Sequence, residues 1–325
     1  MKQISFLGLA LAGLLVLAGV PNRSPAQSAG TPVYSADDQA DNERLMAAAE
    51  KLRKAGQLVR EAVLTNQFNH ASCPVKLDPP KTQPLTGRAL CAAARAAHIR
   101  VGWYYHCAST NEWDLDLAGG YALTKDGVVG TCFHVVQPPD DSRKSYLVAA
   151  DETGRVYPVT EILAASAHAD VAILRVAAKD FKPLPLSTDV QPGDRCACFS
   201  EPDGMRGYYT EGVVSRFVTT TDTPPVLMVD VSLDWAPGSS GSAVLDACGN
   251  LIGHVDTIQS INSDPDDASD NVPPEGKGEK GADKTQENEI ANVPPGGDAS
   301  TSTYMNVHEA VAAKEVLSLI HQPAK

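Results

Sequence analysis

Three short segments of the chain contain the residue types that carry out nucleophilic catalysis. His134 directly follows the apolar-rich run 128–133, and a neutral imidazole accepts a hydroxyl proton near pH 7. Asp170 directly precedes the apolar run 171–174, where a carboxylate can receive the second imidazole N–H and hold the correct tautomer. Ser240 lies in a loop of small residues, and glycines on both sides let the backbone turn tightly and aim N–H groups at one point. Together the segments predict a serine nucleophile with a histidine base and an orienting aspartate.

Each segment also has a plain structural explanation. A histidine after a strand is more often structural than catalytic, an aspartate before a strand is commonly a turn residue, and a Gly/Ser loop needs no function. An α/β-hydrolase is not indicated, because the strand-turn-helix context of its nucleophile is missing around Ser240. The combination of the three segments carries more weight than any of them alone.

Short strands dominate the chain from His98 onward. Residues 99–107 alternate in polarity with period two, and turn sequences such as Lys125-Asp126-Gly127 separate several of the apolar segments that follow. These segments are 120–123, 128–133, 146–150, 156–163, 171–176, 195–199, 212–218, 226–231, 242–245 and 251–257. Short strands at this density, without a long helical pattern between them, predict an antiparallel barrel or sandwich.

The motifs as a set resemble the trypsin-like serine peptidases, and within them the HtrA/Deg family of extracytoplasmic proteases. Residues 119–136 resemble the strand that leads into that family's catalytic histidine, 170–174 its aspartate strand and 237–242 its nucleophile loop. The order His, Asp, Ser is that of chymotrypsin. The resemblance covers roughly residues 99–260 and resumes near 303–320. It implies a mainly-β fold of two six-stranded antiparallel β-barrels, with an added N-terminal helix and a C-terminal helix.

The resemblance also implies a role for each site residue. Ser240 is the expected nucleophile, His134 the base that later protonates the leaving amine, and Asp170 the residue that orients the imidazole. The N–H groups of Gly238 and Ser240, helped by Ser239, are expected to form the oxyanion hole. This chemistry requires no metal and no organic cofactor.

The sequence departs from the HtrA/Deg pattern in three places. Ser239 stands where that family commonly has asparagine, and Ala243 stands where it usually has proline. The sequence after Ile320 is too short for a PDZ domain, the family's usual peptide-sensing module. The resemblance therefore predicts a peptidase without that module.

Three further residues are candidates for substrate binding. Asp234 lies six residues before Ser240, the offset at which trypsin-like enzymes place their primary-specificity residue, so it predicts cleavage after Arg or Lys. The alternative is an acid on a surface loop. Ile258 could narrow the same pocket, and Asp256 is an unusual polar residue on the strand expected to line the cleft.

Charge and the N-terminus indicate where the protein works and what it does not bind. A net charge of -13 at pH 7 disfavours nucleic acid as a partner. Lys2, the apolar run 4–20 and the small residues after it predict a cleaved secretory signal peptide, because the run is short for a membrane-spanning helix. We therefore expect a periplasmic or secreted protein that keeps no stable membrane anchor and acts on proteins or peptides.

The seven cysteines all lie beyond the predicted signal peptide. In an oxidising compartment some of them should form disulfides, with at least one left unpaired because the count is odd. Zinc binding by Cys196 and Cys198 is the alternative, but a lone CxC is weak support for it. On a strand, this spacing simply places both thiols on one buried face.

The predicted organisation has three parts: a signal peptide at 1–28, an N-terminal helical segment with a proline-rich linker at 29–97, and a trypsin-like peptidase domain at 98–325. A disordered acidic insertion is expected at 261–300, where almost nothing can be buried. Residues 36–66 are predicted to form a helix capped by Ser35 or Asp37. This helix is interpreted either as a homo-oligomer or partner interface or as a helix laid on the main domain.

The sequence thus predicts a serine endopeptidase that hydrolyses peptide bonds of exported or unfolded proteins through a His-Asp-Ser triad and an acyl-enzyme intermediate. Two alternatives stay open. One is a catalytically silent trypsin-like binding module, and the other is a hydrolase that acts on esters.

Overall fold

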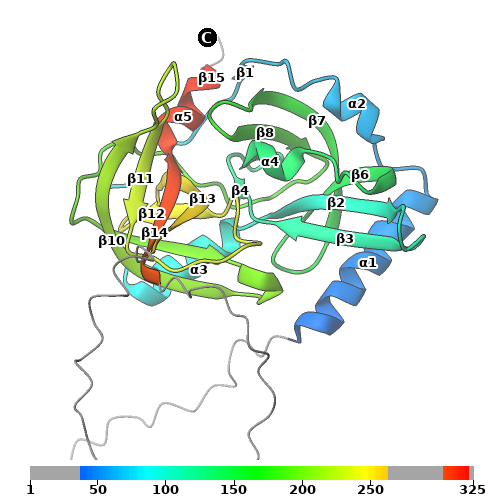
Figure 1. The fold of residues 1–325 in the computed structure, drawn as a ribbon, viewed down its shortest axis with the longest axis horizontal. Coiled ribbons are helices and arrows are strands. Elements are labelled where there is room, and N and C mark those ends of the chain that lie inside the picture. Colours follow the sequence, from blue (N-terminus) through cyan, green and yellow to red (C-terminus); the bar gives the residue numbers. More distant parts are fainter. Residues whose placement is uncertain (1–36, 263–302, 322–325) are drawn as a thin grey trace, which may run out of the picture. The chain divides into compact units, whose positions relative to one another are not determined.

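The computed structural model describes residues 37–262 and 303–321, which contain a two-stranded parallel sheet near the end of the described chain, Cys73–Pro74 with Ile320–His321, and two large β-sheets (Figure 1). One sheet is a closed six-stranded barrel in the order β10-β11-β14-β13-β12-β9. The other is a seven-stranded sheet in the order β3-β2-β6-β7-β8-β5-β4. The predicted signal peptide at 1–28 and Ser35 lie outside the described residues.

The strands are β1 (Cys73–Pro74), β2 (Arg100–Cys107), β3 (Trp113–Ala118), β4 (Tyr121–Ala122), β5 (Val128–Thr131), β6 (Ser142–Ala150), β7 (Val156–Ser166), β8 (Val171–Val176), β9 (Arg195–Ser200), β10 (Tyr208–Thr219), β11 (Leu227–Val231), β12 (Ala243–Asp246), β13 (Leu251–Asn262), β14 (Thr303–Ala312) and β15 (Ile320–His321). The helices are α1 (Asp38–Lys54), α2 (Glu61–Thr65), α3 (Gly87–Ala97), α4 (Phe133–Val136) and α5 (Ala313–Ser318), with a short 3₁₀ turn, η1, at Pro202–Gly204.

The mainly-β fold with two antiparallel sheets is confirmed, and the first sheet differs in detail from a six-stranded barrel. It has seven strands and is curled rather than closed. A bridge between His98 and Tyr121 joins its end strand β4 to the residues just before β2, beside a hydrogen bond from the Ile99 N–H to the Gly120 carbonyl of 3.0 Å. The additional strand, β3, was not predicted, although Trp113, Leu115 and Leu117 alternate with acidic residues in it.

Each sheet closes over its own apolar core, because alternate side chains of a strand point to opposite faces. The first core lies inside the seven-stranded sheet and includes Trp103, Val129 and Leu174. The second lies inside the barrel and includes Val229, Val244 and Ile252.

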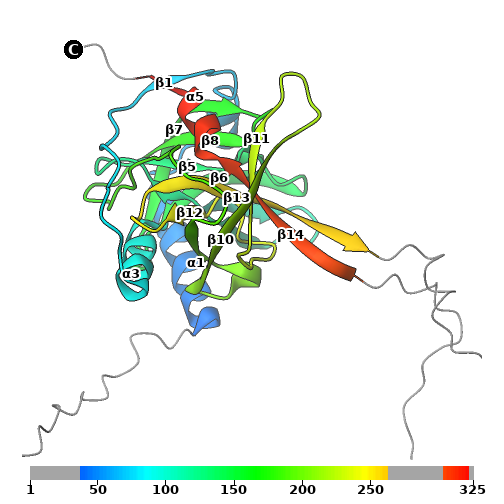
Figure 2. The ribbon, with the colours of Figure 1, turned by 90° about the vertical axis from the view of Figure 1, so that its left-hand side faces the viewer.

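The strands β13 and β14 pair antiparallel over most of their length, from Gly253 with Ala312 to Ile261 with Met305. Figure 2 shows this pair projecting beyond the rest of the barrel. The predicted acidic insertion begins later than expected, because residues 261 and 262 belong to β13. The remainder of that insertion lies outside the described residues.

The predicted helix 36–66 is two helices. Asp37 caps α1 by accepting a hydrogen bond from the Ala40 N–H at 3.0 Å, and Gly56 breaks the helix with a φ of +68°. The apolar face of α1, with Leu45 and Ala49, packs against the outer face of β2, β3, β6 and β7. The helix is therefore laid on the main domain through its apolar face, and its use as an oligomer interface stays a prediction.

The structure holds all seven cysteines as free thiols, and the disulfides stay a prediction. The fully buried thiols lie in three apolar clusters: Cys73 in one, Cys132 in another, and Cys196 with Cys198 in a third. The shared buried face predicted for Cys196 and Cys198 is thus found. None of the helices in residues 37–262 and 303–321 has the length and apolarity needed to span a membrane.

The docking of α1 generates the first prediction. Leu45 is 2% exposed, so Leu45→Ala should lower the free energy of unfolding by about 2–5 kcal/mol in chemical denaturation. Val63 on α2 is 47% exposed, so Val63→Ala should change it by no more than about 0.5 kcal/mol. Equal effects of the two substitutions would contradict the packing of α1 described above.

Candidate active site

His134 and Asp170 form a two-point hydrogen-bonded pair. His134 lies in the single turn α4, directly after β5, and its side chain is 44% exposed. Its backbone N–H donates to Asp170 Oδ1 at 2.9 Å, and its ring Nδ1–H donates to Asp170 Oδ2 at 2.7 Å. Among the described residues, nothing hydrogen-bonds to the ring Nε2. One carboxylate therefore fixes both the orientation and the tautomer of the imidazole, and leaves Nε2 available to accept a proton.

Asp170 is held in an unusual backbone conformation by a second, buried histidine. Its φ is +49°, in the left-handed region that residues other than glycine rarely adopt. The His254 Nε2–H donates to the Asp170 carbonyl at 3.1 Å, and Tyr121 donates its hydroxyl to His254 Nδ1 at 3.1 Å. Complete burial lowers the pKa of His254 to about 4, so the ring is neutral. From the sequence alone no role could be assigned to His254, and its hydrogen bond to Asp170 was not predicted.

The contacts between His134 and Asp170 lower the pKa of the aspartate and raise that of the histidine. Burial is the largest single influence and would raise the pKa of Asp170, but the hydrogen bonds and charge of His134, together with a hydrogen bond from Asp256, outweigh it and hold that pKa well below its usual range. The same hydrogen bond raises the pKa of His134 against the opposing effect of burial. The pair is therefore built to stabilise an imidazolium ion beside a carboxylate.

The loop that carries Ser240 is pressed against the strand end that leads to His134. The Gly119 N–H donates to the Ser240 carbonyl at 2.8 Å, and Gly241 adopts a φ of +78°. A Cβ on Gly241 would lie 2.4 Å from Thr131 Oγ1 and 3.0 Å from the Cys132 nitrogen, so only glycine fits there. No hydrogen bond joins the Ser240 hydroxyl to the imidazole within residues 37–262 and 303–321. The contacts nevertheless bring the three predicted residues to one place.

Two backbone N–H groups of the same loop have no acceptor within the described ranges. These belong to Gly238, whose φ is +94°, and to Ser240. The N–H between them, that of Ser239, donates to the Ala236 carbonyl at 3.1 Å. Two open donors separated by one engaged donor can bind an oxygen that becomes negatively charged.

A mainly apolar pocket adjoins Ser240. Its lining residues are Trp235, Ala236, Pro237, Val255, Asp256, Thr257 and Ile258. The predicted substrate residues Asp256 and Ile258 therefore lie beside Ser240, whereas Asp234 does not. Asp234 is exposed and lines a different hollow, because the next residue, Trp235, turns inward and donates its indole N–H to the Thr257 carbonyl at 3.2 Å. This placement corresponds to the surface-loop alternative for Asp234 rather than to a basic-residue pocket.

Asp256 belongs to a cluster of proton-carrying groups behind the imidazole. One potential ligand atom from each of Cys132, His134, Asp170 and Asp256 lies within 4.8 Å of the others. Burial, together with a hydrogen bond to Asp170, raises the pKa of Asp256 to about 7. A divalent metal is the other occupant such a cluster can accept. However, the Cys132 thiol donates to the Val255 carbonyl at 3.1 Å, and its complete burial raises its pKa well above the usual value, so it is a poor source of the thiolate that a metal needs.

The geometry has clear counterparts among known proteins. Residues 119–253 match the family profile of the trypsin-like peptidase domain. This match begins just before β4 and ends within β13. The chain is similar in fold to a solved structure described as "HtrA-type protease AlgW with decapeptide", with a TM-score of 0.50 at 16% identity, covering 72% of this chain and 66% of that one.

Curated relatives of the chain carry serine protease names. The chain is 30% identical over 142 residues to a probable periplasmic serine endoprotease DegP-like of Halomonas elongata, and the match covers 42% of this chain and 28% of the relative. It is 29% identical over 152 residues to Protease Do-like 1, chloroplastic, of Arabidopsis thaliana, which covers 43% of this chain and 33% of that relative. The chain therefore spans about a third of the length of these relatives.

The contact between Asp256 and His134 leads to a prediction that can be tested without measuring enzyme activity. Because the Asp256 carboxylate raises the pKa of His134, Asp256→Asn should lower the His134 pKa, by up to about one unit, in an NMR titration of the imidazole. Asp234→Asn is the matched control, since Asp234 is exposed and lines another hollow, and should leave that pKa unchanged. An unchanged His134 pKa in Asp256→Asn would show that the two groups are not coupled.

Proposed function

We propose that the protein is an exported serine endopeptidase in which Ser240 is the nucleophile, His134 the general base and acid, and Asp170 the orienting carboxylate. The observation that carries this proposal is the two-point His134–Asp170 pair, which leaves Nε2 free beside the loop of Ser240. The trypsin-like peptidase profile and the serine endoprotease names of the relatives support the reaction class.

The proposed reaction proceeds in two halves through an acyl-enzyme. The Ser240 oxygen attacks the carbonyl carbon of the scissile peptide bond while its proton passes to His134 Nε2. The resulting oxyanion accepts hydrogen bonds from the N–H groups of Gly238 and Ser240, which have no other acceptor among the described residues. His134 then gives the proton to the leaving amine, and the C–N bond breaks. In the second half His134 takes a proton from water, the hydroxide attacks the acyl ester, and Ser240 regains its proton.

This assignment leaves Ser239 out of the oxyanion hole, because its N–H already donates to Ala236. Removal of one oxyanion donor typically costs about 10²–10³-fold in kcat, so two open donors are a substantial part of the proposed catalysis.

The substrate class follows from the pocket beside Ser240 and from the location suggested by the relatives. A mainly apolar pocket, closed by Trp235 and Ile258, accepts an apolar side chain before the scissile bond. Two of the relatives are named periplasmic, which agrees with the predicted signal peptide and supports export of this chain. We therefore propose that the substrates are exported or unfolded proteins cut after apolar residues.

The nucleophile is tested by chemical labelling and proteolysis together. The wild-type protein should label with a fluorophosphonate probe and cleave casein, and Ser240→Ala should abolish labelling and lower turnover by up to about 10⁶-fold. Ser215→Ala is the matched control, because Ser215 is an exposed serine on β10, and should behave as the wild type. A wild-type protein that neither labels nor cleaves would overturn the proposal in favour of the silent binding module.

The pocket is tested with peptides that differ only in the residue before the cleaved bond. A Val or Leu there should give kcat/KM at least about tenfold above Arg, because a guanidinium is costly to bury in a mainly apolar pocket whose one carboxyl group, Asp256, is engaged with Asp170. Asp234→Asn should leave this ratio unchanged, since Asp234 lines a different hollow. A preference for Arg that disappears in Asp234→Asn would instead establish basic specificity.

A further inference from the structure

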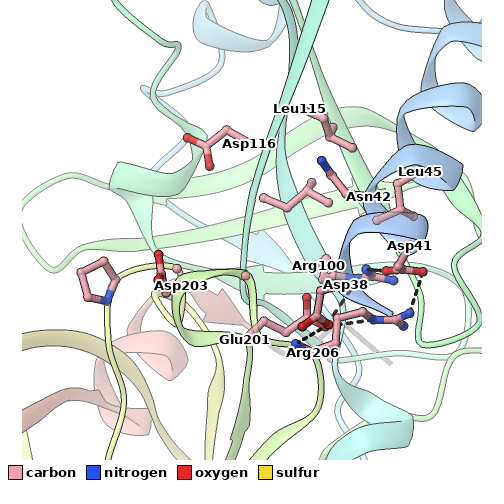
Figure 3. A pocket seen from close by; sticks show the side chains of 14 residues that line it. Asp38, Asp41, Asn42, Leu45, Arg100, Leu115, Asp116, Glu201, Asp203 and Arg206 are labelled. Atoms are coloured by element: carbon pink, nitrogen blue, oxygen red, sulfur yellow. Dashed lines mark hydrogen bonds and ion pairs between the residues drawn. The ribbon is translucent and has the colours of Figure 1, made fainter. Parts of the chain in front are cut away.

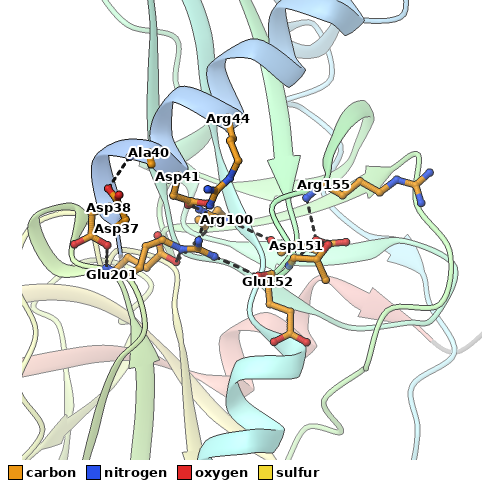
Figure 4. Close-up of polar contacts among 12 residues, drawn as sticks. Asp37, Asp38, Ala40, Asp41, Arg44, Arg100, Asp151, Glu152, Arg155 and Glu201 are labelled. Carbon is orange, nitrogen blue, oxygen red and sulfur yellow. Dashed lines mark hydrogen bonds and ion pairs between the residues drawn. The ribbon is translucent and has the colours of Figure 1, made fainter. Parts of the chain in front are cut away.

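A buried ion-pair network joins α1 to both sheets. Asp41, in the first turn of α1, is only 2% exposed. It accepts a hydrogen bond from Arg100 of β2 at 2.7 Å and forms an ion pair with Arg206, from the segment between β9 and β10, at 2.6 Å (Figure 3). A third contact, from Arg44 at 2.8 Å, comes from α1 itself (Figure 4). One carboxylate thus ties the helix to two parts of the chain that are far apart in sequence.

The same network holds the segment 201–206 at both of its ends. At one end, the Arg206 backbone N–H donates to Asp38 Oδ1 at 3.1 Å. At the other, the Glu201 carboxylate lies 3.7 Å from Arg100 Nε and 3.9 Å from Arg206 Nε. Figure 3 shows these side chains gathered at the start of α1, with Asp203 farther along the same segment. Because a buried charge that loses its partner is strongly unfavourable, the segment is confined to conformations that keep these pairs.

The segment 201–206 in turn contacts the loop of Ser240. The Asp203 N–H donates to the Pro237 carbonyl at 2.7 Å. A Cβ added to Gly238 would lie 2.9 Å from the Glu201 carbonyl oxygen and 3.3 Å from the Asp203 nitrogen. The two backbones are therefore in close contact where Gly238 adopts its left-handed φ of +94°.

This contact determines where the Gly238 N–H points. The Pro237 carbonyl and the Gly238 N–H belong to one planar trans peptide group, so they point in opposite directions and rotate together. A hydrogen bond that fixes the carbonyl also fixes the N–H. Rotation of this peptide group would remove one of the two open donors beside Ser240.

We infer that α1 is a positioning element of the reaction: through Arg206, Asp41 holds segment 201–204 in the conformation that directs the Gly238 N–H toward the oxyanion. This inference rests on the proposed function, and it extends the catalytic machinery to a helix outside the two sheets. Leu45 and Ala49 already supply apolar packing for α1, whereas a buried ion pair is weak as a stabilising device. The buried ion pairs of Asp41 are explained by a different task, which is to hold segment 201–206 in place.

Arg206→Ala is the substitution that separates positioning from general stability. It removes the side-chain ion pairs of Arg206 with Asp41 and Glu201, and it retains both the backbone hydrogen bond to Asp38 and the Asp41–Arg100 pair. Arg206 is partly exposed, so the variant should fold. Arg44→Ala is the matched control, because it also removes a partner of Asp41 but one that lies on α1 and does not reach the segment. Arg206→Lys retains the charge and should recover part of the lost activity.

We expect Arg206→Ala to lower kcat by at least about tenfold with little change in KM, because an oxyanion donor acts in the transition state. Binding of a peptide boronate, whose tetrahedral adduct occupies the same donors, should weaken in parallel. Arg44→Ala should keep the wild-type kcat at a similar thermal midpoint. Equal kcat values in Arg206→Ala and the wild type, or equal losses in Arg206→Ala and Arg44→Ala, would overturn the inference.

Hydrogen exchange distinguishes this inference from the proposed function. In Arg206→Ala, amides of residues 236–241 should exchange faster than in the wild type or in Arg44→Ala, whether or not the protein turns over substrate. Unchanged exchange in 236–241 would overturn the link between α1 and this loop. A wild type without turnover would refute the proposed function instead, and the catalytic role of α1 with it.

Discussion

The hydrogen-bonded pair of His134 and Asp170 is the interaction on which the geometry of the site depends. Both oxygens of one carboxylate are used, one by a backbone N–H and one by the ring of the same histidine, so the imidazole has little freedom to turn. Asp170 can do this only in a left-handed conformation, which costs energy for a residue with a side chain. Its carbonyl is therefore held by His254, which is oriented in turn by Tyr121. These supporting residues are fully buried, which makes the support rigid.

Two hydrogen bonds that hold the site residues in place connect one sheet with the other. His254 belongs to β13 of the barrel, yet it holds Asp170, which precedes β8 of the seven-stranded sheet. The Gly119 N–H, just before β4, likewise holds the Ser240 carbonyl of the barrel. The relative position of base and nucleophile is thus determined by contacts between sheets rather than within either one. The network around Asp41 adds a third such connection, because it joins Arg100 of the first sheet to Arg206 beside the barrel.

Local patterns in the sequence predicted most of the strands, because alternation and turn residues depend on near neighbours in the chain. They also singled out His134, Asp170 and Ser240, whose catalytic roles stay a proposal. The break between α1 and α2 was missed, since charged and apolar residues continue through 55–60 and only Gly56 marks the turn. The contacts of Asp41 and His254 could not be predicted either, because each depends on partners from distant segments and a single buried carboxylate or imidazole has no local signature. The specificity role of Asp234 stays a prediction, and its offset from Ser240 could not show that Trp235 is buried while Asp234 is exposed.

Asp170 and Asp256 give the site opposite responses to pH. The folded-state pKa of Asp170 lies below the unfolded value of about 3.9, so its stabilising contribution is present above that value and is lost as the pH falls. The folded-state pKa of Asp256 is raised to about 7, so its contribution is complete below the unfolded value and is lost as the pH rises toward 7. Between these limits the two carboxyl groups hold one proton and one negative charge. That single charge is what an imidazolium at His134 requires, and above pH 7 a second charge appears beside it and strengthens His134 as a base.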